Sequence, residues 1–316
     1  MRLGIQIDDF TWPGGAVEIA PTLGRIVRTA DEVGFDSIWV MDHFFQIRGV
    51  GPETDPMLEG YTTLGWIAAL TTRARLGLMV GGVHYRQAGL WAKATTTLDV
   101  LSGGRAWLGI GAAWNESESR GLGFAFPPLG ERFERLEEHY AILTGLWGTP
   151  QDETFTFDGI YYHLKDSPAL PKPVQRPHPP LIVGGGGPRR TPRLAATYGS
   201  EFNLPFSSVT DTAAQYQRVR AACVARGRDP VTLRLSVAQT VCCGTNENEV
   251  ERRASNIGRK ADELRAYGVA GTPDEVVARL RAFADIGAET IYLQVLDLND
   301  FEHIDLLADE VLPQVS

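Results

Sequence analysis

The chain has 316 residues, a formal net charge of −9 and 43% hydrophobic residues. With 22% charged residues it has the composition of an ordinary soluble globular enzyme, which excludes wholesale disorder. No basic run offers a footprint for nucleic acid, so we expect no nucleic-acid partner. No apolar run reaches the roughly 18 residues of a transmembrane helix, and the N-terminus lacks the apolar core of a signal peptide. We therefore expect a cytoplasmic protein with no membrane association.

Short apolar segments alternate with segments of helical periodicity along most of the chain. The expected strands cover residues 3–7, 37–41, 75–80, 107–110, 181–183, 201–204, 233–241 and 291–295. The expected helices cover residues 19–33, 61–70, 90–101, 133–147, 192–198, 213–226, 248–267, 273–287 and 304–312. Apolar strands between amphipathic helices indicate a parallel sheet that is buried on both faces. Eight such units predict a closed (β/α)8 TIM-like barrel, and an open doubly wound sheet is the alternative.

The alternation breaks between about residues 150 and 180. Residues 154–164 contain two aromatic-rich runs around Asp158-Gly159, which predicts a β-hairpin. Six prolines follow between Pro168 and Pro180, which is typical of an ordered loop without helix or strand. We therefore expect one domain over residues 1–316, with an insertion after the fourth β/α unit.

Polar and small residues follow the expected strands, where a barrel of this class carries its active site. These strand ends hold Asp8-Asp9, Asp42-His43, Gly81-Gly82 with His84, residues 111–116 and Gly184, Gly185, Gly186 and Gly187. Glycine has no Cβ, so these ends leave room for a large flat ligand to approach the backbone. Aromatic side chains that could line an apolar mouth, or belong to the core, are Phe44, Phe45, Tyr61, Trp66, His84 and Trp114.

The four glycines at 184–187 and the arginines that follow them form the clearest candidate site. A glycine-rich strand end before a helix offers backbone N–H groups to an anion. Arg189 and Arg190 would add charge-assisted hydrogen bonds to phosphate or carboxylate. A tight turn with two solvated arginines is the alternative.

The Asp42-His43 pair places an acid beside a proton-titrating ring at the second strand end. A purely structural role for this pair is the alternative. His43 and His84 could supply nitrogen ligands, but no set of three or four ligands accompanies them, so no metal site is predicted. Three cysteines form neither a disulfide framework nor a ligand spacing, and a Ser-His-Asp hydrolase is disfavoured because no Gly-x-Ser-x-Gly motif occurs.

The sequence resembles the bacterial luciferase-like monooxygenase superfamily. The most specific match is Lys93–Arg105, with its Thr-Leu-Asp and Ser-Gly-Gly-Arg motifs, followed by Leu-Gly-Ile-Gly at 108–111. Further matches lie at residues 37–43, 181–187 and 269–273. The resemblance covers nearly the whole chain and implies a TIM-like barrel, an insertion after the fourth unit and a homodimer.

This superfamily divides by cofactor, FMN or the deazaflavin coenzyme F420, and the chain is more similar to the F420 branch. By that resemblance Asp42 and His43 lie beside the ring, with His43 as the catalytic residue. A cis peptide bond is implied between Met79 and Val80, behind the ring and next to Gly81 and Gly82. Asn115 would contact the ring, and the glycines at 184–187 with Arg189 and Arg190 would bind the phosphate.

Two positions depart from the members that oxidise sugar phosphates. Those members carry a catalytic Glu in a longer fourth-strand loop, where Ala113 and Trp114 stand here, and a Trp where Ile47 stands here. Both departures argue against a sugar-phosphate substrate. The predicted function is hydride transfer between F420 and a small organic substrate. The alternatives are an FMN-dependent monooxygenase that uses reduced flavin and O₂, and a deazaflavin-binding protein without turnover.

Overall fold

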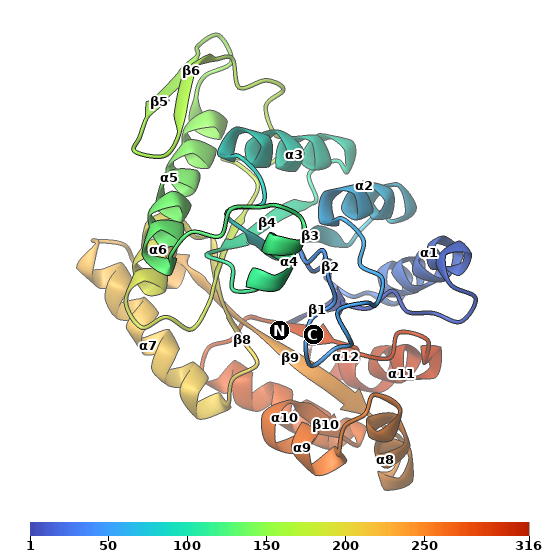
Figure 1. Ribbon diagram of the computed structural model, residues 1–316. Coiled ribbons are helices and arrows are strands. Elements are labelled where there is room, and N and C mark those ends of the chain that lie inside the picture. Colours follow the sequence, from blue (N-terminus) through green and yellow to red (C-terminus); the bar gives the residue numbers. More distant parts are fainter. Residues whose placement is uncertain (316) are drawn as a thin grey trace.

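Parallel strands close into a barrel in the computed structural model, which describes residues 1–315 (Figure 1). The barrel strands are β1 (Arg2–Ile7), β2 (Ser37–Val40), β3 (Arg75–Gly82), β4 (Ala106–Gly111), β7 (Leu181–Gly184), β8 (Glu201–Pro205), β9 (Arg234–Cys243) and β11 (Thr290–Gln294). Each strand pairs in parallel with the next, and β11 pairs with both β9 and β1, which closes the ring. The predicted eight-stranded TIM-like barrel is confirmed.

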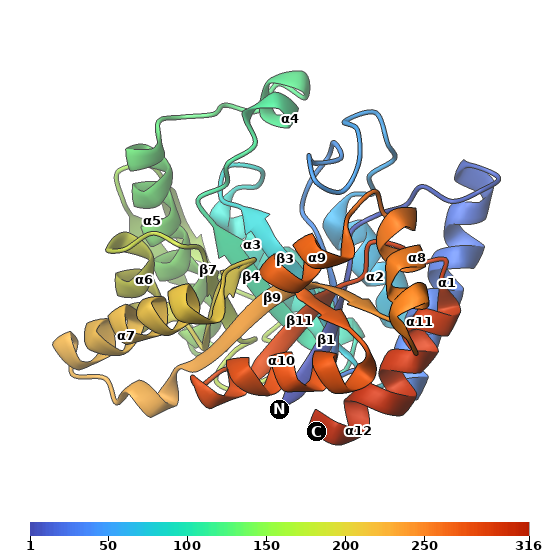
Figure 2. The same ribbon diagram turned by 90° about the horizontal axis from the view of Figure 1, so that it is seen from below.

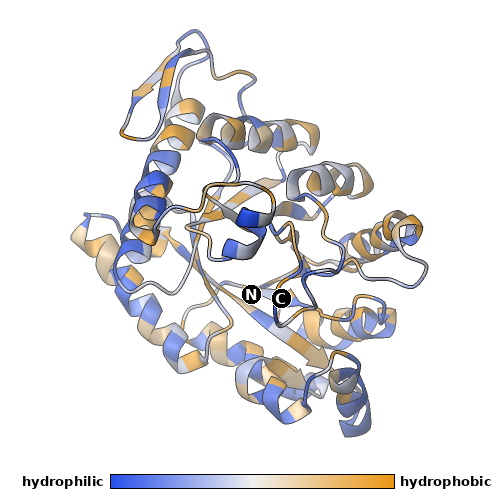
Figure 3. Cartoon of the chain, viewed as in Figure 1, coloured by the Kyte–Doolittle hydropathy of each residue, from blue (hydrophilic) through white to orange (hydrophobic). Residues whose placement is uncertain are grey.

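Most of the helices surround this barrel and bury apolar faces against it. The helices are α1 (Ala16–Val33), α2 (Gly60–Leu70), α3 (Ala88–Leu101), α4 (Glu116–Gly121), α5 (Leu129–Gly148), α6 (Arg190–Tyr198), α7 (Val209–Ala225), α8 (Glu247–Asn256), α9 (Ala261–Tyr267), α10 (Pro273–Asp285), α11 (Phe301–Leu306) and α12 (Leu312–Val315), with a 3-10 turn η1 (Pro230–Thr232) and a π-helical segment η2 (Leu307–Val311). Strand β9 is largely hydrophobic toward its carboxyl end in Figure 3, whereas α7 alternates hydrophilic and hydrophobic residues. None of the described helices has the length and apolar character needed to cross a membrane.

Large side chains fill the inside of the barrel near the amino ends of its strands. Trp39 packs edge-to-face on Trp107 and on Tyr292, with ring centroids 6.2 and 5.0 Å apart. The indole of Trp39 fits because residue 77 is glycine: a Cβ there would lie 2.4 Å from this ring. The Tyr292 hydroxyl donates to the buried Glu201 carboxylate at 2.5 Å. The cavity that lies inside the barrel is found toward the carboxyl ends of the strands.

The insertion between α5 and β7 contains the predicted hairpin. Strands β5 (Phe155–Asp158) and β6 (His163–Ser167) pair antiparallel and lie beside α5 (Figure 1). The Glu138 carboxylate on α5 accepts hydrogen bonds from three successive backbone N–H groups of the hairpin turn, residues 160–162. The proline-rich segment that follows has neither helix nor strand, as predicted, and the Asp99 carboxylate holds it through the N–H groups of Val174 and Gln175.

Several elements differ from the sequence prediction, which included neither α4 nor η1. The single helix expected over 248–267 is wrong, because the chain turns at Gly258, which has φ +67°, and forms α8 and α9 instead. A short strand, β10 (Val269–Gly271), adds in parallel to the carboxyl end of β9. The helix expected over 304–312 starts earlier and passes through the π-helical segment η2. Pro273 at the first turn of α10 and the capping box of Thr272 with Glu275 agree with the prediction.

Candidate active site

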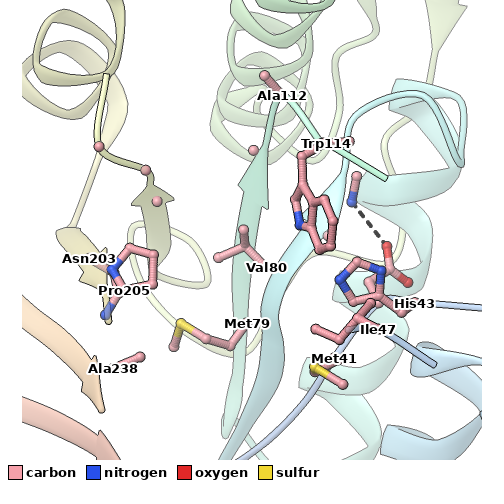
Figure 4. Close-up of a pocket in the computed structure, with 18 of the residues that line it drawn as sticks. Met41, His43, Ile47, Met79, Val80, Ala112, Trp114, Asn203, Pro205 and Ala238 are labelled. Carbon is pink, nitrogen blue, oxygen red and sulfur yellow. Dashed lines mark hydrogen bonds between the residues drawn. The ribbon is translucent and has the colours of Figure 1, made fainter. Parts of the chain in front are cut away.

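A cavity of about 620 Å³ opens at the carboxyl ends of the barrel strands. Figure 2 shows the short helix α4 on this side of the barrel, away from the two termini. Figure 4 shows how the cavity wall is divided. On one side of Val80 lie Met41, His43, Ile47 and Trp114, and on the other lie Met79, Asn203, Pro205 and Ala238. The cavity therefore spans the barrel mouth from the β2 side to the β8 side.

Most of the predicted site residues meet at this cavity. Its lining includes Asp42, His43, Met79, Val80, Gly81, Gly82, Gly184, Gly185, Gly186 and Gly187. The peptide bond between Met79 and Val80 is cis, as the resemblance implied. Backbone from four successive strands thus forms one wall, because β2, β3, β4 and β7 are neighbours in the barrel.

Asn115, Arg189 and Arg190 do not line the cavity. The Asn115 side chain caps α4, where its Oδ1 accepts from the N–H of Ser117 at 3.2 Å. Arg189 is exposed before α6, and Arg190 donates to the Gly130 carbonyl at 3.0 Å. Thr191, at the start of α6, lines the cavity instead. A hydroxyl residue in the first turn of the helix after the glycine run was the sequence signal for it.

Asp42 is buried, and its carboxylate accepts hydrogen bonds from other residues of the protein. Arg86 donates to both of its oxygens at 2.8 and 2.9 Å, and the Gly82 N–H donates at 3.1 Å. Arg86 also pairs with Glu59. Burial raises the pKa of Asp42 and outweighs the opposing effect of Arg86 and of the Gly82 N–H. The Asp42 side chain is only 1% exposed, so it acts on the cavity by holding the backbone at Gly82.

His43 is held by a residue that the sequence analysis missed. Its Nδ1 lies 2.7 Å from Oε1 of Glu118 on α4, and Glu118 is fully buried. The Tyr85 hydroxyl donates to the same oxygen at 2.6 Å, and the Phe44 N–H donates to Oε2 at 2.7 Å. Burial raises the pKa of Glu118, but the hydrogen bonds from these donors lower it further, so the group is ionised. No sequence spacing links residues 43 and 118, which meet only through the fold.

The loop after β4 brings Trp114 over His43. Their rings meet edge-to-face with centroids 5.5 Å apart, and Trp114 is 63% exposed. The loop is fixed by Arg132, whose guanidinium donates to the carbonyls of Ala112 and Ala113 at 2.9 and 2.7 Å. Of the aromatic candidates from the sequence, Trp114 lines the cavity, and Phe44, Phe45, Tyr61, Trp66 and His84 do not.

The surroundings of His84 do not favour a role as a metal ligand. Its Nε2 lies 2.8 Å from the Ser119 hydroxyl, and burial together with the nearby Arg132 lowers its pKa to about 4. It is therefore neutral at physiological pH. No cluster of three or more His, Cys, Asp or Glu side chains able to hold a metal ion occurs in residues 1–315.

Carboxamide side chains line the cavity deep in the barrel, and the sequence analysis did not single them out. They belong to Gln6 on β1, Asn203 on β8 and Gln294 on β11. The Oε1 atom of Gln6 is buried without a hydrogen-bond partner among the described residues. Amides donate and accept hydrogen bonds, so this group can match a heterocyclic ring edge that carries both carbonyl and N–H groups.

The luciferase-like monooxygenase family model matches residues 1–268, which is most of the chain. The chain belongs to the luciferase-like monooxygenase family. The resemblance read from the motifs is thereby confirmed, and the curated relatives of this luciferase-like protein are enzymes, so it is an enzyme.

Relatives of this luciferase-like enzyme use two cofactors. An F420-dependent glucose-6-phosphate dehydrogenase of Kineococcus radiotolerans is 36% identical over 180 residues, 56% of this chain and 50% of that protein. The chain thus aligns with about half the length of that relative. The protein of the same name in Amycolatopsis mediterranei is 25% identical over 90% of this chain and 92% of its own. An FMNH(2)-dependent dimethylsulfone monooxygenase of Pseudomonas putida is 27% identical over 72% of this chain and 70% of its own.

A solved structure of an F420-dependent secondary alcohol dehydrogenase, in complex with an F420-acetone adduct, has the same fold as this luciferase-like enzyme. The TM-score is 0.82 over 100% of this chain and 99% of that one, with 19% sequence identity. At that identity the likeness concerns the barrel alone.

Proposed function

We propose that this enzyme is an F420-dependent oxidoreductase that moves a hydride between the deazaflavin and a small organic substrate. The observation that carries the proposal is the cavity wall of bare backbone from Val80 to Gly82 and from Gly184 to Gly187, with His43 at one end. A flat ring can lie against such a wall because the glycines carry no side chains, although at Gly81 and Gly82 a Cβ would meet Trp91 and Tyr85 of the protein itself. The F420-dependent relatives support the choice of cofactor.

The residues present fit such a cofactor. Gly184 and Gly187 line the cavity, and each is packed closely on its own neighbours: a Cβ would lie 3.2 Å from Val80 at Gly184 and 3.0 Å from the Thr191 hydroxyl at Gly187. The N–H groups of Gly186, Gly187 and the first turn of α6 would hold the phosphate, whereas the Gly185 N–H already donates to the Asn203 carbonyl at 3.1 Å. Gln6 would pair its free Oε1 with a ring-edge donor. Arg189 and Arg190 would reach an anionic tail outside the cavity. F420, when bound, supplies a carbon that accepts or gives a hydride.

The protein's part is then to bind, orient and exclude water. Arg132 holds the loop that carries Trp114 against the cavity mouth. His43 is the titratable side chain placed to exchange a proton with the substrate. The apolar lining, with Met41, Ile47, Leu129, Phe133 and Phe206, favours an apolar substrate over a sugar phosphate.

Equilibrium binding read by cofactor fluorescence tests the proposal. Wild-type protein should bind F420 and catalyse its redox exchange with a substrate, and micromolar binding of FMN without binding of F420 would overturn the choice. Gly186→Val should weaken F420 binding at least about tenfold, which is 1.4 kcal/mol. A Cβ at this position would lie 3.7 Å from Leu204, which is ordinary van der Waals contact, so the fold should tolerate the change. Gly89→Val, on α3 where a Cβ has open space, is the matched control and should bind as wild type.

Two further variants separate binding from turnover. Arg189→Ala with Arg190→Ala should weaken cofactor binding by about 1–3 kcal/mol if both arginines meet the anionic tail. Unchanged affinity would show that they are only solvated. His43→Ala should lower turnover at least about tenfold and leave cofactor affinity within about threefold. Weakened binding with a normal hydride-transfer rate would reassign His43 to cofactor binding.

A second candidate is an FMN-dependent monooxygenase, which the Pseudomonas putida relative supports. Oxygen consumption with reduced FMN separates it from the first, because a deazaflavin activates O₂ poorly. A deazaflavin-binding protein without turnover would bind F420 and show no exchange with any substrate. We also propose the homodimer that the resemblance implies and the cytoplasmic location expected from the sequence, and light scattering of the purified protein tests the dimer.

A further inference from the structure

Four groups that can donate a hydrogen bond contact the two oxygens of the Glu118 carboxylate. Its Oε2 accepts from the backbone N–H of Phe44 at 2.7 Å and of Phe45 at 3.4 Å. Its Oε1 lies 2.6 Å from the Tyr85 hydroxyl and 2.7 Å from Nδ1 of His43. An ionised carboxylate only accepts hydrogen bonds, so each of these four groups must present a hydrogen to it.

This arrangement decides which nitrogen of His43 carries the proton. A neutral imidazole has one N–H and one bare nitrogen, and the partner of one nitrogen sets the state of the other. With its proton on Nδ1, facing Glu118, neutral His43 has a bare Nε2. That atom has no hydrogen-bond partner among residues 1–315, and the ring lines the cavity with 15% of its side-chain surface exposed.

We infer that Glu118 is a positioning residue that fixes His43 in its Nδ1–H tautomer, so that the group offered to the substrate is a proton acceptor. This inference rests on the proposed function and deepens it. The substrate that fits carries a hydroxyl on the reacting carbon. As the C–H bond breaks and its electron pair leaves as hydride to the bound cofactor, the O–H bond breaks and its proton goes to Nε2. The products are a carbonyl compound, the reduced cofactor and an imidazolium ion that Glu118 stabilises, and the reverse reaction returns the same proton.

An isosteric change at residue 118 should invert the tautomer. In Glu118→Gln the amide oxygen must face the Phe44 N–H, because a backbone donor cannot become an acceptor. The amide NH₂ then faces His43 and Tyr85, both of which can switch to accepting. His43 would accept at Nδ1 and carry its proton on Nε2. The cavity would then present a donor where the wild type presents an acceptor.

Nitrogen NMR of the substrate-free protein tests this directly. Long-range proton–nitrogen correlation spectra of histidine-labelled protein should show the Nδ1–H form of His43 in the wild type and the Nε2–H form in Glu118→Gln, with the His43→Gln spectrum giving the assignment. Glu116→Gln is the matched control on the same helix: Glu116 pairs with Arg120 at the surface, and its spectrum should match the wild type. An Nε2–H tautomer in the wild type would overturn the inference, even if Glu118→Gln fails to fold.

Kinetics provides the second measurement. With an alcohol substrate, Glu118→Gln should lower kcat at least tenfold and change KM less than threefold, while Glu116→Gln keeps both. A normal kcat in a Glu118→Gln protein that shows the inverted tautomer would also overturn the inference. The NMR result needs neither cofactor nor substrate, so a failure of the proposed function and a failure of this inference are distinguishable.

Discussion

Removing the positive charge at Arg86 should destabilise the barrel more than any surface change. The Arg86 side chain is 9% exposed, donates two hydrogen bonds to the buried Asp42 carboxylate and stacks near Trp91, with 4.8 Å from its guanidinium carbon to the ring centroid. Arg86→Met keeps the apolar stem but leaves Asp42 without its counter-charge. Breaking a buried pair from one side costs about 3–5 kcal/mol. For a domain of this size the melting temperature should fall by about 5–15 °C.

A double-mutant cycle shows whether the unpaired charge causes this loss. Asp42→Asn removes the charge and keeps an oxygen for the Gly82 N–H, so Arg86→Met with Asp42→Asn should recover at least about 2 kcal/mol relative to Arg86→Met alone. Unfolding by urea or heat at pH 7, followed by far-UV circular dichroism, measures all four proteins. The reasoning fails if Arg86→Met costs less than about 1 kcal/mol, or if the two changes simply add.

Two other stability predictions concern buried polar groups away from the cavity. The Asp31 carboxylate accepts hydrogen bonds from the successive N–H groups of residues 72–74 at 2.7–3.0 Å. Asp31→Ala should therefore lower the free energy of unfolding by about 2–4 kcal/mol. The exposed Glu32→Ala is the control, and a urea midpoint of Asp31→Ala no lower than that of the control would contradict this prediction. His303 is buried and accepts from the Cys243 N–H, and burial lowers its pKa to about 4, below the 6.5 of an unfolded histidine. The unfolded chain therefore binds a proton first as pH falls, and the wild type should lose about 2 kcal/mol from this group between pH 7 and pH 5. His303→Gln should show a correspondingly shallower decline of stability with pH, and parallel curves would refute the assignment.

The parts of the fold that were predictable are those whose signal is local in sequence. Barrel strands are buried on both faces, so they are continuous apolar runs, and the glycines at the carboxyl ends of β3 and β7 mark where a ligand can approach the backbone. The helix over 248–267 was wrong because a single glycine with positive φ ends α8 within a charged, periodic segment. The hydrophobic periodicity of the segment cannot distinguish a turn at this glycine from a helix that continues through it.

The site was predictable to the extent that it lies at strand ends. His43 and the glycines were found in this way, whereas Glu118 was missed because its contact with His43 joins residues 75 positions apart. The prediction for Asn115 failed for the opposite reason, because a local role of its side chain was overlooked. Its side chain caps α4, a use that an Asn before an acidic turn also suggests, and this explains its place outside the cavity lining.

The aromatic cluster of Trp39, Trp107 and Tyr292 stops the barrel at its amino end. The cavity is therefore a well that is closed at its inner end. Ligands enter and leave it one after the other through a single opening. Two ligands that share such a well cannot exchange independently: the one that lies deeper enters first and departs last. A ligand bound nearer Trp114 then prevents the deeper ligand from leaving until the outer ligand has dissociated. For two ligands bound one above the other in this cavity we therefore expect ordered kinetics, in which excess outer ligand slows release of the inner one.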